Sequence, residues 1–233
     1  MIIILEKHID TLSNCSLFKG IKSEEILTII TCMKARILQY RSGDIIVSAD
    51  NKLNDICIVL DGNVEISKDN INGNKIIMNK FYKGDVFGEI IALSNVANSY
   101  ITITAIVPST ILLLQTRIVK TTCQNSCNAH NLLISNIIEE LANKAMFLNL
   151  KILYLSIKSM RAKLCTFLYN TYLKSNTSKF SIKFNRNELA DFLNVSRPSM
   201  SRELGRLRDE NILSFTGYQF ELLDIEKITE YVE

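Results

Sequence analysis

The sequence predicts an α+β fold with three parts: an N-terminal antiparallel β-roll (jelly roll), one long helix, and a C-terminal domain of short helices with a small hairpin. Alternating apolar runs separated by turn signals extend to about residue 115, an apolar heptad covers residues 134–155, and two short amphipathic helical stretches occupy residues 187–204. A chain of 233 residues is long enough for two domains. We therefore expect the roll at 1–127, the long helix at 128–155 and the C-terminal domain at 156–233.

The roll is predicted from strand alternation and from turns. Ile56, Ile58 and Leu60 alternate with other residues before a turn at Asp61–Asn63, and a second alternating run follows that turn. Further turn signals are SGD (42–44), NGN (72–74) and KGD (83–85). Short strands separated by such turns are typical of an antiparallel sandwich or roll.

The long helix is predicted from apolar residues that recur at alternating spacings of 4 and 3. They are Ile134, Ile138, Leu141, Ala145, Leu148, Ile152 and Leu155. A helix of about 28 residues spans about 40 Å, which is more than one small domain needs, so we expect this seam to pair with a second copy of the chain. Leu133, Ile137 and Met146 offer a second apolar face for packing on the roll. A helix packed only against its own chain is the alternative.

Composition and segment lengths exclude several classes of protein. With 47% hydrophobic and 22% charged residues the chain is globular, and its N-terminal run MIIIL is too short for a signal sequence or a membrane span. We expect a cytoplasmic protein that does not bind membranes. Six scattered cysteines without a CxxC pair favour a reducing compartment. The stretch between His8 and His130 has no histidine, and no Ser-His-Asp or Walker-type arrangement occurs, so we expect no enzyme.

Positive charge is concentrated in the C-terminal domain. Between Ser156 and Arg208 there are 11 Lys and Arg against 3 Asp and Glu, whereas the whole chain carries a net charge of only +3. The remainder of the chain is therefore acidic. This unevenness predicts that the basic region binds an anion.

The two short helical stretches have the features of a helix-turn-helix. Asn187 is expected to cap the first helix, Asn194 to form a left-handed turn, and Ser196 to cap the second helix, with Pro198 in its first turn. The first helix would bury Leu189, and the second would bury residues at helical spacing such as Met200, Leu204 and Leu207. After them, ILSFTGYQFEL (212–222) predicts a hairpin wing with its turn at Thr216–Gly217.

The positions of this motif that are expected to face solvent carry several hydroxyl and guanidinium groups. Arginine side chains pair with guanine in the major groove, and hydroxyls bond base edges or phosphates, so we expect double-stranded DNA as the partner. The predicted DNA-binding residues are Arg186, Ser196, Arg197, Ser199, Ser201, Arg202 and Arg206. An ordinary helical hairpin with a solvated basic face is the alternative.

The order of parts resembles the Crp/Fnr family of bacterial transcription regulators. Two motifs carry the resemblance: GDVFGEI (84–90) followed by ITITA (101–105), and RNELADFLNVSRPSMSRELGRLRDENIL (186–213). Arg197 and Arg202 match the reading arginines of the family, and Pro198 stands where the family often has a glutamate. The resemblance implies a homodimer that controls transcription from a palindromic operator containing G·C pairs. It also implies a contact with RNA polymerase in activators, although no residue here identifies one.

The resemblance implies an effector in the roll, but that effector is not expected to be cyclic AMP. In members that bind cyclic AMP, an Arg-Ser pair after the Gly-Glu pair holds the cyclic phosphate, whereas the aligned residues here are Ser99 and Tyr100. An enclosed phosphodiester needs a cationic partner, and none is supplied at this position. The pocket positions implied for an unidentified effector are Gly88, Glu89, Ser99, Tyr100, Leu148 and Asn149.

An iron–sulfur cluster is not expected either. The oxygen sensors of the family hold several cysteines near the N-terminus, and this chain has Cys15 alone there. One alternative is a haem or redox sensor that uses Cys123, Cys127 and His130, which are spaced by 4 and 3, although the polar stretch around them favours a surface loop and no metal site. The other alternative is a constitutive DNA-binding regulator whose roll takes no ligand.

Overall fold

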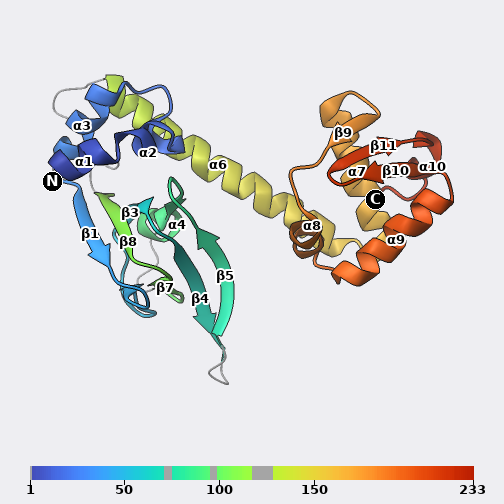
Figure 1. The fold of residues 1–233 in the computed structure, drawn as a ribbon, viewed down its shortest axis with the longest axis horizontal. Helices are drawn as coiled ribbons and strands as arrows, with labels where there is room; N and C mark the ends of the chain where they lie inside the picture. Colours follow the sequence, from blue (N-terminus) through green and yellow to red (C-terminus); the bar gives the residue numbers. More distant parts are fainter. Residues whose placement is uncertain (1, 71–74, 95–98, 117–127) are drawn as a thin grey trace. The chain divides into compact units, whose positions relative to one another are not determined.

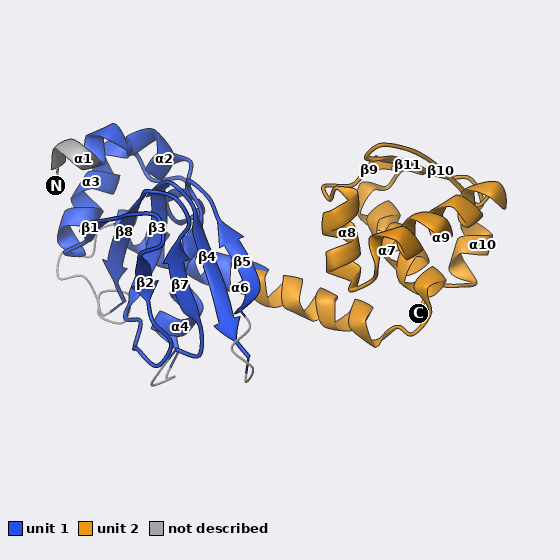
Figure 2. Ribbon diagram, turned by 60° about the horizontal axis from the view of Figure 1, so that its bottom comes forward, with its two compact units in different colours: residues 1–143 blue, residues 144–233 orange. Residues whose placement is uncertain are grey.

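The computed structural model describes residues 2–70, 75–94, 99–116 and 128–233 (Figure 1). They form two compact units, Met1–Asn143 and Lys144–Glu233 (Figure 2). The division falls inside the long helix, α6 (Asn128–Ser156), so each unit contains one part of that helix. Among the described helices, none is long and apolar enough to span a membrane.

The first unit contains two antiparallel four-stranded sheets, in agreement with the predicted roll. The first sheet has the order β1-β8-β3-β6, and its strands are β1 (Arg36–Tyr40), β8 (Ser109–Gln115), β3 (Asp55–Asp61) and β6 (Val86–Phe87). The second has the order β2-β7-β4-β5, and its strands are β2 (Ile45–Val47), β7 (Thr102–Ala105), β4 (Val64–Asp69) and β5 (Lys75–Phe81). Among the described residues of this unit, the helices besides the start of α6 are α1 (Ile2–Lys7), α2 (Ile9–Ser13), the 3-10 helix η1 (Ser16–Phe18), α3 (Ser23–Cys32) and α4 (Glu89–Leu93).

Consecutive residues of β3 are buried from Asp55 to Leu60. Because successive side chains of a strand point to opposite sides, both faces of β3 are covered. Ile56, Ile58 and Leu60 belong to a core shared with α1–α3 and the start of α6. Cys57 and Val59 belong to a second core between the two sheets. The first sheet is therefore the middle layer of the unit, with helices on one face and the second sheet on the other (Figure 1).

The turn after β3 carries the chain from the first sheet to the second, so β3 and β4 do not form a hairpin within one sheet. Gly62 adopts the left-handed conformation there, with φ of 87°. A Cβ at this position would lie only 2.5 Å from the Pro108 carbonyl oxygen. Only glycine fits this turn without a shift of the backbone.

The first part of α6 packs on the helical side of the roll. Leu133 and Ile137 are buried in the core shared with α1–α3, and the Asn136 side-chain amide donates hydrogen bonds of 2.9 Å to the carbonyl oxygens of Leu17 and Lys19. The prediction that Met146 packs on the roll was wrong. Met146 is 61% exposed and belongs to the second unit.

Much of the predicted dimer seam on α6 is exposed in the single chain. Ile138 and Ile152 are 62% and 63% exposed, and Leu148 and Leu155 are also exposed. Leu141 differs, because it packs partly against the core of the first unit. Pairing of this seam with a second copy stays a prediction.

The second unit consists of the last part of α6, four shorter helices and a three-stranded antiparallel sheet of order β10-β11-β9. The helices are α7 (Met160–Ser175), α8 (Arg186–Leu193), α9 (Arg197–Asp209) and α10 (Ile225–Thr229), and the strands are β9 (Lys179–Ser181), β10 (Leu213–Thr216) and β11 (Gln219–Leu222). Thr216 pairs with Gln219, so the turn of the wing consists of Gly217 and Tyr218. This turn lies one residue later than predicted.

Candidate DNA-binding surface

Helix α8 begins with a capping box on Asn185. The Asn185 side-chain oxygen accepts hydrogen bonds from the backbone N–H groups of Asn187 and Glu188, both at 2.9 Å, and the Glu188 carboxylate accepts from the Asn185 N–H at 2.7 Å. The prediction that Asn187 is the cap was wrong, because the helix already starts at Arg186 and Asn187 lies within it. The capping box fixes the first turn of α8 through two reciprocal bonds.

The turn between α8 and α9 follows the prediction. Asn194 is left-handed, with φ of 52° and ψ of 57°, and the Ser196 hydroxyl accepts a hydrogen bond from the Ser199 N–H at 3.3 Å. The end of α8 is held from another helix as well. The Lys163 ammonium group, on α7, donates to the Leu193 carbonyl at 3.2 Å, where the helix dipole favours a cation.

The predicted hydroxyl and arginine side chains meet at the front of α9. The Ser196 and Ser199 hydroxyl oxygens are 2.7 Å apart, and the Arg202 guanidinium donates to the Ser199 hydroxyl at 3.2 Å. Arg197, Ser201 and Arg202 are exposed, whereas Met200, Leu204 and Leu207 are buried. Helix α9 therefore presents a polar surface with one arginine already oriented by a hydroxyl.

Arg186 lies against the wing. Its guanidinium lies 4.8 and 4.9 Å from the ring centres of Phe215 and Phe220, and one of its nitrogens donates to the Gly217 carbonyl at 3.4 Å. Burial lowers the pKa of Arg186. These contacts attach the wing to the start of α8, and no sequence motif predicted them.

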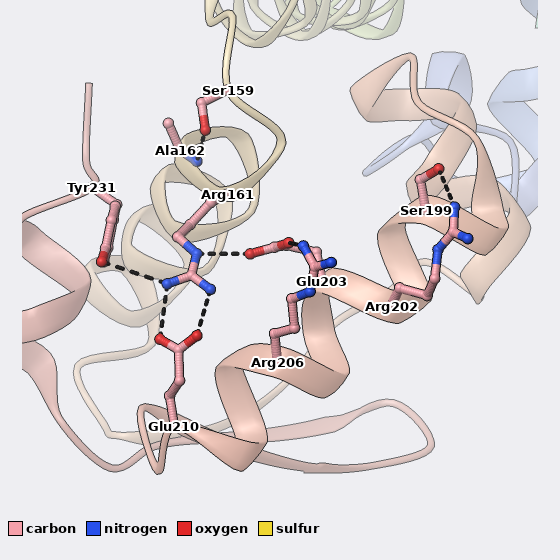
Figure 3. A network of polar contacts seen from close by, with 9 residues as sticks. All are labelled: Ser159, Arg161, Ala162, Ser199, Arg202, Glu203, Arg206, Glu210 and Tyr231. Atoms are coloured by element: carbon pink, nitrogen blue, oxygen red, sulfur yellow. Dashed lines mark hydrogen bonds and ion pairs between the residues drawn. The ribbon is translucent and has the colours of Figure 1, made fainter.

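A network of ion pairs connects α7 to α9 (Figure 3). The Arg161 guanidinium donates to Glu203 at 2.7 Å and makes a bidentate pair with Glu210 at 2.6 and 2.8 Å. Its Cζ atom lies 5.1 Å from the centre of the Tyr231 ring. The second oxygen of Glu203 accepts from Arg206 at 3.1 Å. The hydrogen bond to Glu210 is the largest of several effects that raise the pKa of Arg161 further, so this guanidinium is always charged.

The residues predicted for the effector pocket are divided between the two units. Ser99 is buried, and its hydroxyl donates to the Ile101 carbonyl at 3.0 Å and accepts from the Ile101 N–H at 3.2 Å. Gly88 is left-handed, Glu89 is buried at the start of α4, and Tyr100 is 59% exposed. Leu148 and Asn149 are exposed on the part of α6 that belongs to the second unit.

A cavity of about 470 Å³ opens elsewhere in the roll, between β1, β2 and the segment before β3. Its apolar wall includes Leu38, Leu53 and Leu113, and its polar wall includes Lys52 and an ion pair of 2.7 Å between Arg36 and Asp55. Burial raises the pKa of the Cys57 thiol, which also lines the cavity, so this thiol is neutral. None of the predicted effector residues lines the cavity, and no sequence motif pointed to it.

The structure describes one of the three residues of the haem or redox alternative. Cys123 and Cys127 lie outside the described residues. His130 lies on α6 and is 2% exposed, and neither of its ring nitrogens has a hydrogen-bond partner within the described structure. Among the described residues, no group of His, Cys, Asp and Glu side chains could hold a metal ion.

Comparisons with known proteins match both units. The family model of the cyclic nucleotide-binding domain matches residues 37–126, and that of the Crp-like helix-turn-helix domain matches residues 162–231. The probable transcriptional regulator flp of Lacticaseibacillus casei is 22% identical over 215 residues, covering 92% of this chain and 94% of that protein.

Solved structures show the same fold. The catabolite activator protein of Thermus thermophilus matches with a TM-score of 0.52 and 20% identity, covering 93% of this chain and 97% of that one. CprK in its complex with OCPA matches with a TM-score of 0.60 and 12% identity, covering 89% and 93%. With both domain models matched in this order, the chain belongs to the Crp/Fnr family of transcription regulators.

Proposed function

We propose that the protein is a homodimeric regulator that reads a palindromic operator through α9, under the control of an effector in the roll that is not cyclic AMP. The observation that carries the proposal is the front of α9, where Arg202 is exposed and oriented by the Ser199 hydroxyl. An arginine held in this way loses less conformational freedom when it pairs with guanine O6 and N7. The other DNA-contacting residues of the proposal are Ser196, Arg197 and Ser201 at the same end of α9, Arg206 one helical turn after Arg202, and Arg186 at the start of α8.

The dimer of the proposal forms along α6. Exposed isoleucine and leucine side chains at heptad spacing are the usual means by which two helices pair. A two-fold dimer places two recognition helices about one DNA turn apart, about 34 Å, which is why such proteins read palindromes. The proposal keeps three functional segments: the roll (1–127), the dimer helix (128–155) and the DNA-binding domain (156–233).

The effector of the proposal acts by population shift, in that it favours one packing of the two α6 helices over another. The cavity bounded by Arg36 and Leu113 is the space that we assign to it, since its volume lies in the usual range for small-molecule sites. Two alternatives stand beside this assignment. One is a constitutive regulator without a ligand. The other is a haem or redox sensor, and its supporting observation is the buried imidazole of His130, which has no hydrogen-bond partner among the described residues. We place the protein in the cytoplasm, with its DNA.

The test is a selection of DNA by the purified full chain from a random double-stranded library, followed by sequencing and sedimentation of the complex. We expect enriched palindromes with half-sites about 10 base pairs apart and two chains per duplex. Enrichment of sites without two-fold symmetry, or no enrichment over the starting library, would overturn the proposal.

A further inference from the structure

Glu203 is a carboxylate of the recognition helix that faces inward, with its side chain only 11% exposed. A buried carboxylate is costly unless it is paired and hydrogen-bonded. Its two oxygens have different partners: Arg161 donates to one at 2.7 Å, and Arg206 donates to the other at 3.1 Å. Figure 3 shows the two guanidinium groups on opposite sides of this carboxylate.

The two arginines are held very differently. Arg161 has a side chain 20% exposed and is fixed by Glu203, Glu210 and Tyr231 together. The Arg206 side chain is 70% exposed, and Glu203 is the acid with which it pairs. The ion pair between Arg206 and Glu203 is therefore weaker than that between Arg161 and Glu203, because water and salt screen it. Arg206 can leave Glu203 while Arg161 stays bound to it.

Arg206 lies on the same stripe of α9 as Ser199 and Arg202, two of the residues that contact DNA in the proposed function. Ser199, Arg202 and Arg206 are spaced by 3 and 4 residues, which places them on one face of a helix. An arginine at the end of such a stripe, nearer the end of the helix than the base-reading residues, suits a phosphate of the DNA backbone.

We propose that Arg161 is a positioning residue that keeps Arg206 available for a DNA phosphate. By neutralising Glu203 from inside the domain, Arg161 leaves Arg206 with a weak pair that DNA can replace. Without Arg161, Glu203 would be a buried charge with a single counterion, and it would hold Arg206 with both oxygens and keep it away from the phosphate. The inference rests on the proposed function, since it assumes that α9 meets DNA.

The experiment measures the affinity of the full-length protein for its selected operator over a range of salt concentrations. The slope of log K against log salt changes by about 0.9 for each phosphate contact. We expect Arg206→Met to reduce the slope by about one such contact, and Arg161→Met, which does not alter any DNA-facing side chain, to reduce it by the same amount. The double variant Arg161→Met with Glu203→Gln should regain the slope of the wild type, because no carboxylate is left to retain Arg206.

Each outcome decides the inference. A wild-type slope in Arg161→Met, or no recovery in the double variant, would overturn it, because a purely structural role of Arg161 would weaken binding without a reversal by Glu203→Gln. Thermal unfolding of each variant shows that the domain is folded; if Arg161→Met is not, Arg161→Gln keeps an amide donor beside Glu203 and carries the same expectation. Failure of the proposed function is a separate result, because then the wild-type protein itself would bind no operator.

Discussion

The two units differ in the polar side chains around their predicted functional positions. In the second unit, charged groups of α7 hold α8 and α9 from inside, through Lys163 on the Leu193 carbonyl and Arg161 on Glu203 and Glu210, and the arginines of α9 remain on the surface. In the first unit, the Ser99 hydroxyl bonds the backbone of Ile101 just before β7, and this buried serine stands where the resemblance implied a phosphate-binding arginine. The second unit therefore presents the arginines of α9 at its surface, whereas the first unit has a buried serine at position 99 and an exposed tyrosine at position 100.

The substitution with the largest expected effect removes an aromatic side chain from the core of the second unit and tests whether the two units unfold separately. Phe192 is 7% exposed and packs against Tyr154, Phe167 and Phe184. We expect Phe192→Ala to lower the free energy of unfolding of this unit by about 3–5 kcal/mol, since large-to-small changes in a core leave a cavity. Urea unfolding followed by circular dichroism should show an early transition for this unit and an unchanged one for the roll. Tyr218→Ala, at the exposed wing tip, serves as the control, and an equal shift of both transitions would break the comparison.

The seam of α6 provides the next test, because it is the surface by which two copies would join. Burial of an isoleucine contributes about 1.5–3 kcal/mol, and a dimer contains the change twice, so we expect Ile152→Asp to raise the dimer Kd on the order of 100-fold or more. Sedimentation velocity measures this shift. Leu173→Asp on α7 is the matched control, since Leu173 is 57% exposed but lies outside the seam. Equal weakening by both variants would argue that the seam is not the interface.

Arg202 tests the base-reading surface itself. A bidentate arginine contact to guanine contributes about 1–3 kcal/mol of discrimination, so Arg202→Ala should weaken operator binding by that amount and relax specificity at one position of each half-site. Arg208→Ala, which removes an arginine that pairs with Asp209, should preserve the sequence preference. Fluorescence anisotropy with the operator and single-base variants measures both effects. If Arg202→Ala binds within about 1 kcal/mol of the wild type, Arg202 does not read a base.

Substitutions at two glycines of the roll distinguish the cost of a left-handed backbone from the cost of a steric clash. Gly43 and Gly62 have φ values of 88° and 87°, but a Cβ at Gly43 would meet nothing within 4 Å, whereas at Gly62 it would collide with the backbone of Pro108 and Ser109. We expect Gly43→Ala to cost about 1–2 kcal/mol from its left-handed conformation alone. Gly62→Ala should cost at least about 1 kcal/mol more, as overpacking does. Equal unfolding midpoints for the two variants would show that the backbone of the 61–63 turn shifts at little cost to accommodate a Cβ at position 62.

The smallest expected effect belongs to the hydroxyl that orients Arg202. Ser199→Ala removes a hydrogen bond of 3.2 Å to this arginine, and a hydrogen bond of this kind contributes about 0.5–1.5 kcal/mol. We expect Ser199→Ala to reduce operator affinity by that amount in the wild-type protein. In the Arg202→Ala variant, the same substitution should have no effect on operator affinity. Additive losses in this double-mutant cycle would show that Ser199 acts separately from Arg202.

The parts predicted correctly from the sequence are those set by local chemistry. The left-handed Asn194, the Ser196 cap and the buried stripe of α9 depend on residues only a few positions apart. The missed parts depend on distant residues: Arg161 lies 42 residues from Glu203, and Asn136 lies 119 residues from the Leu17 carbonyl that it binds. The wrong cap at Asn187 shows that even local signals leave a helix start uncertain by two residues when two asparagines lie close together.

The two-faced burial of β3 has a mechanical consequence for the roll. Cys57 lines the cavity on one side of this strand, and its neighbours Ile56 and Ile58 belong to the core on which α6 rests. One strand therefore separates this cavity from the core that contains Leu133 and Ile137 of α6. Under the proposed function, an effector that displaced β3 by a fraction of an ångström would act on this core directly, because a close-packed interior transmits strain.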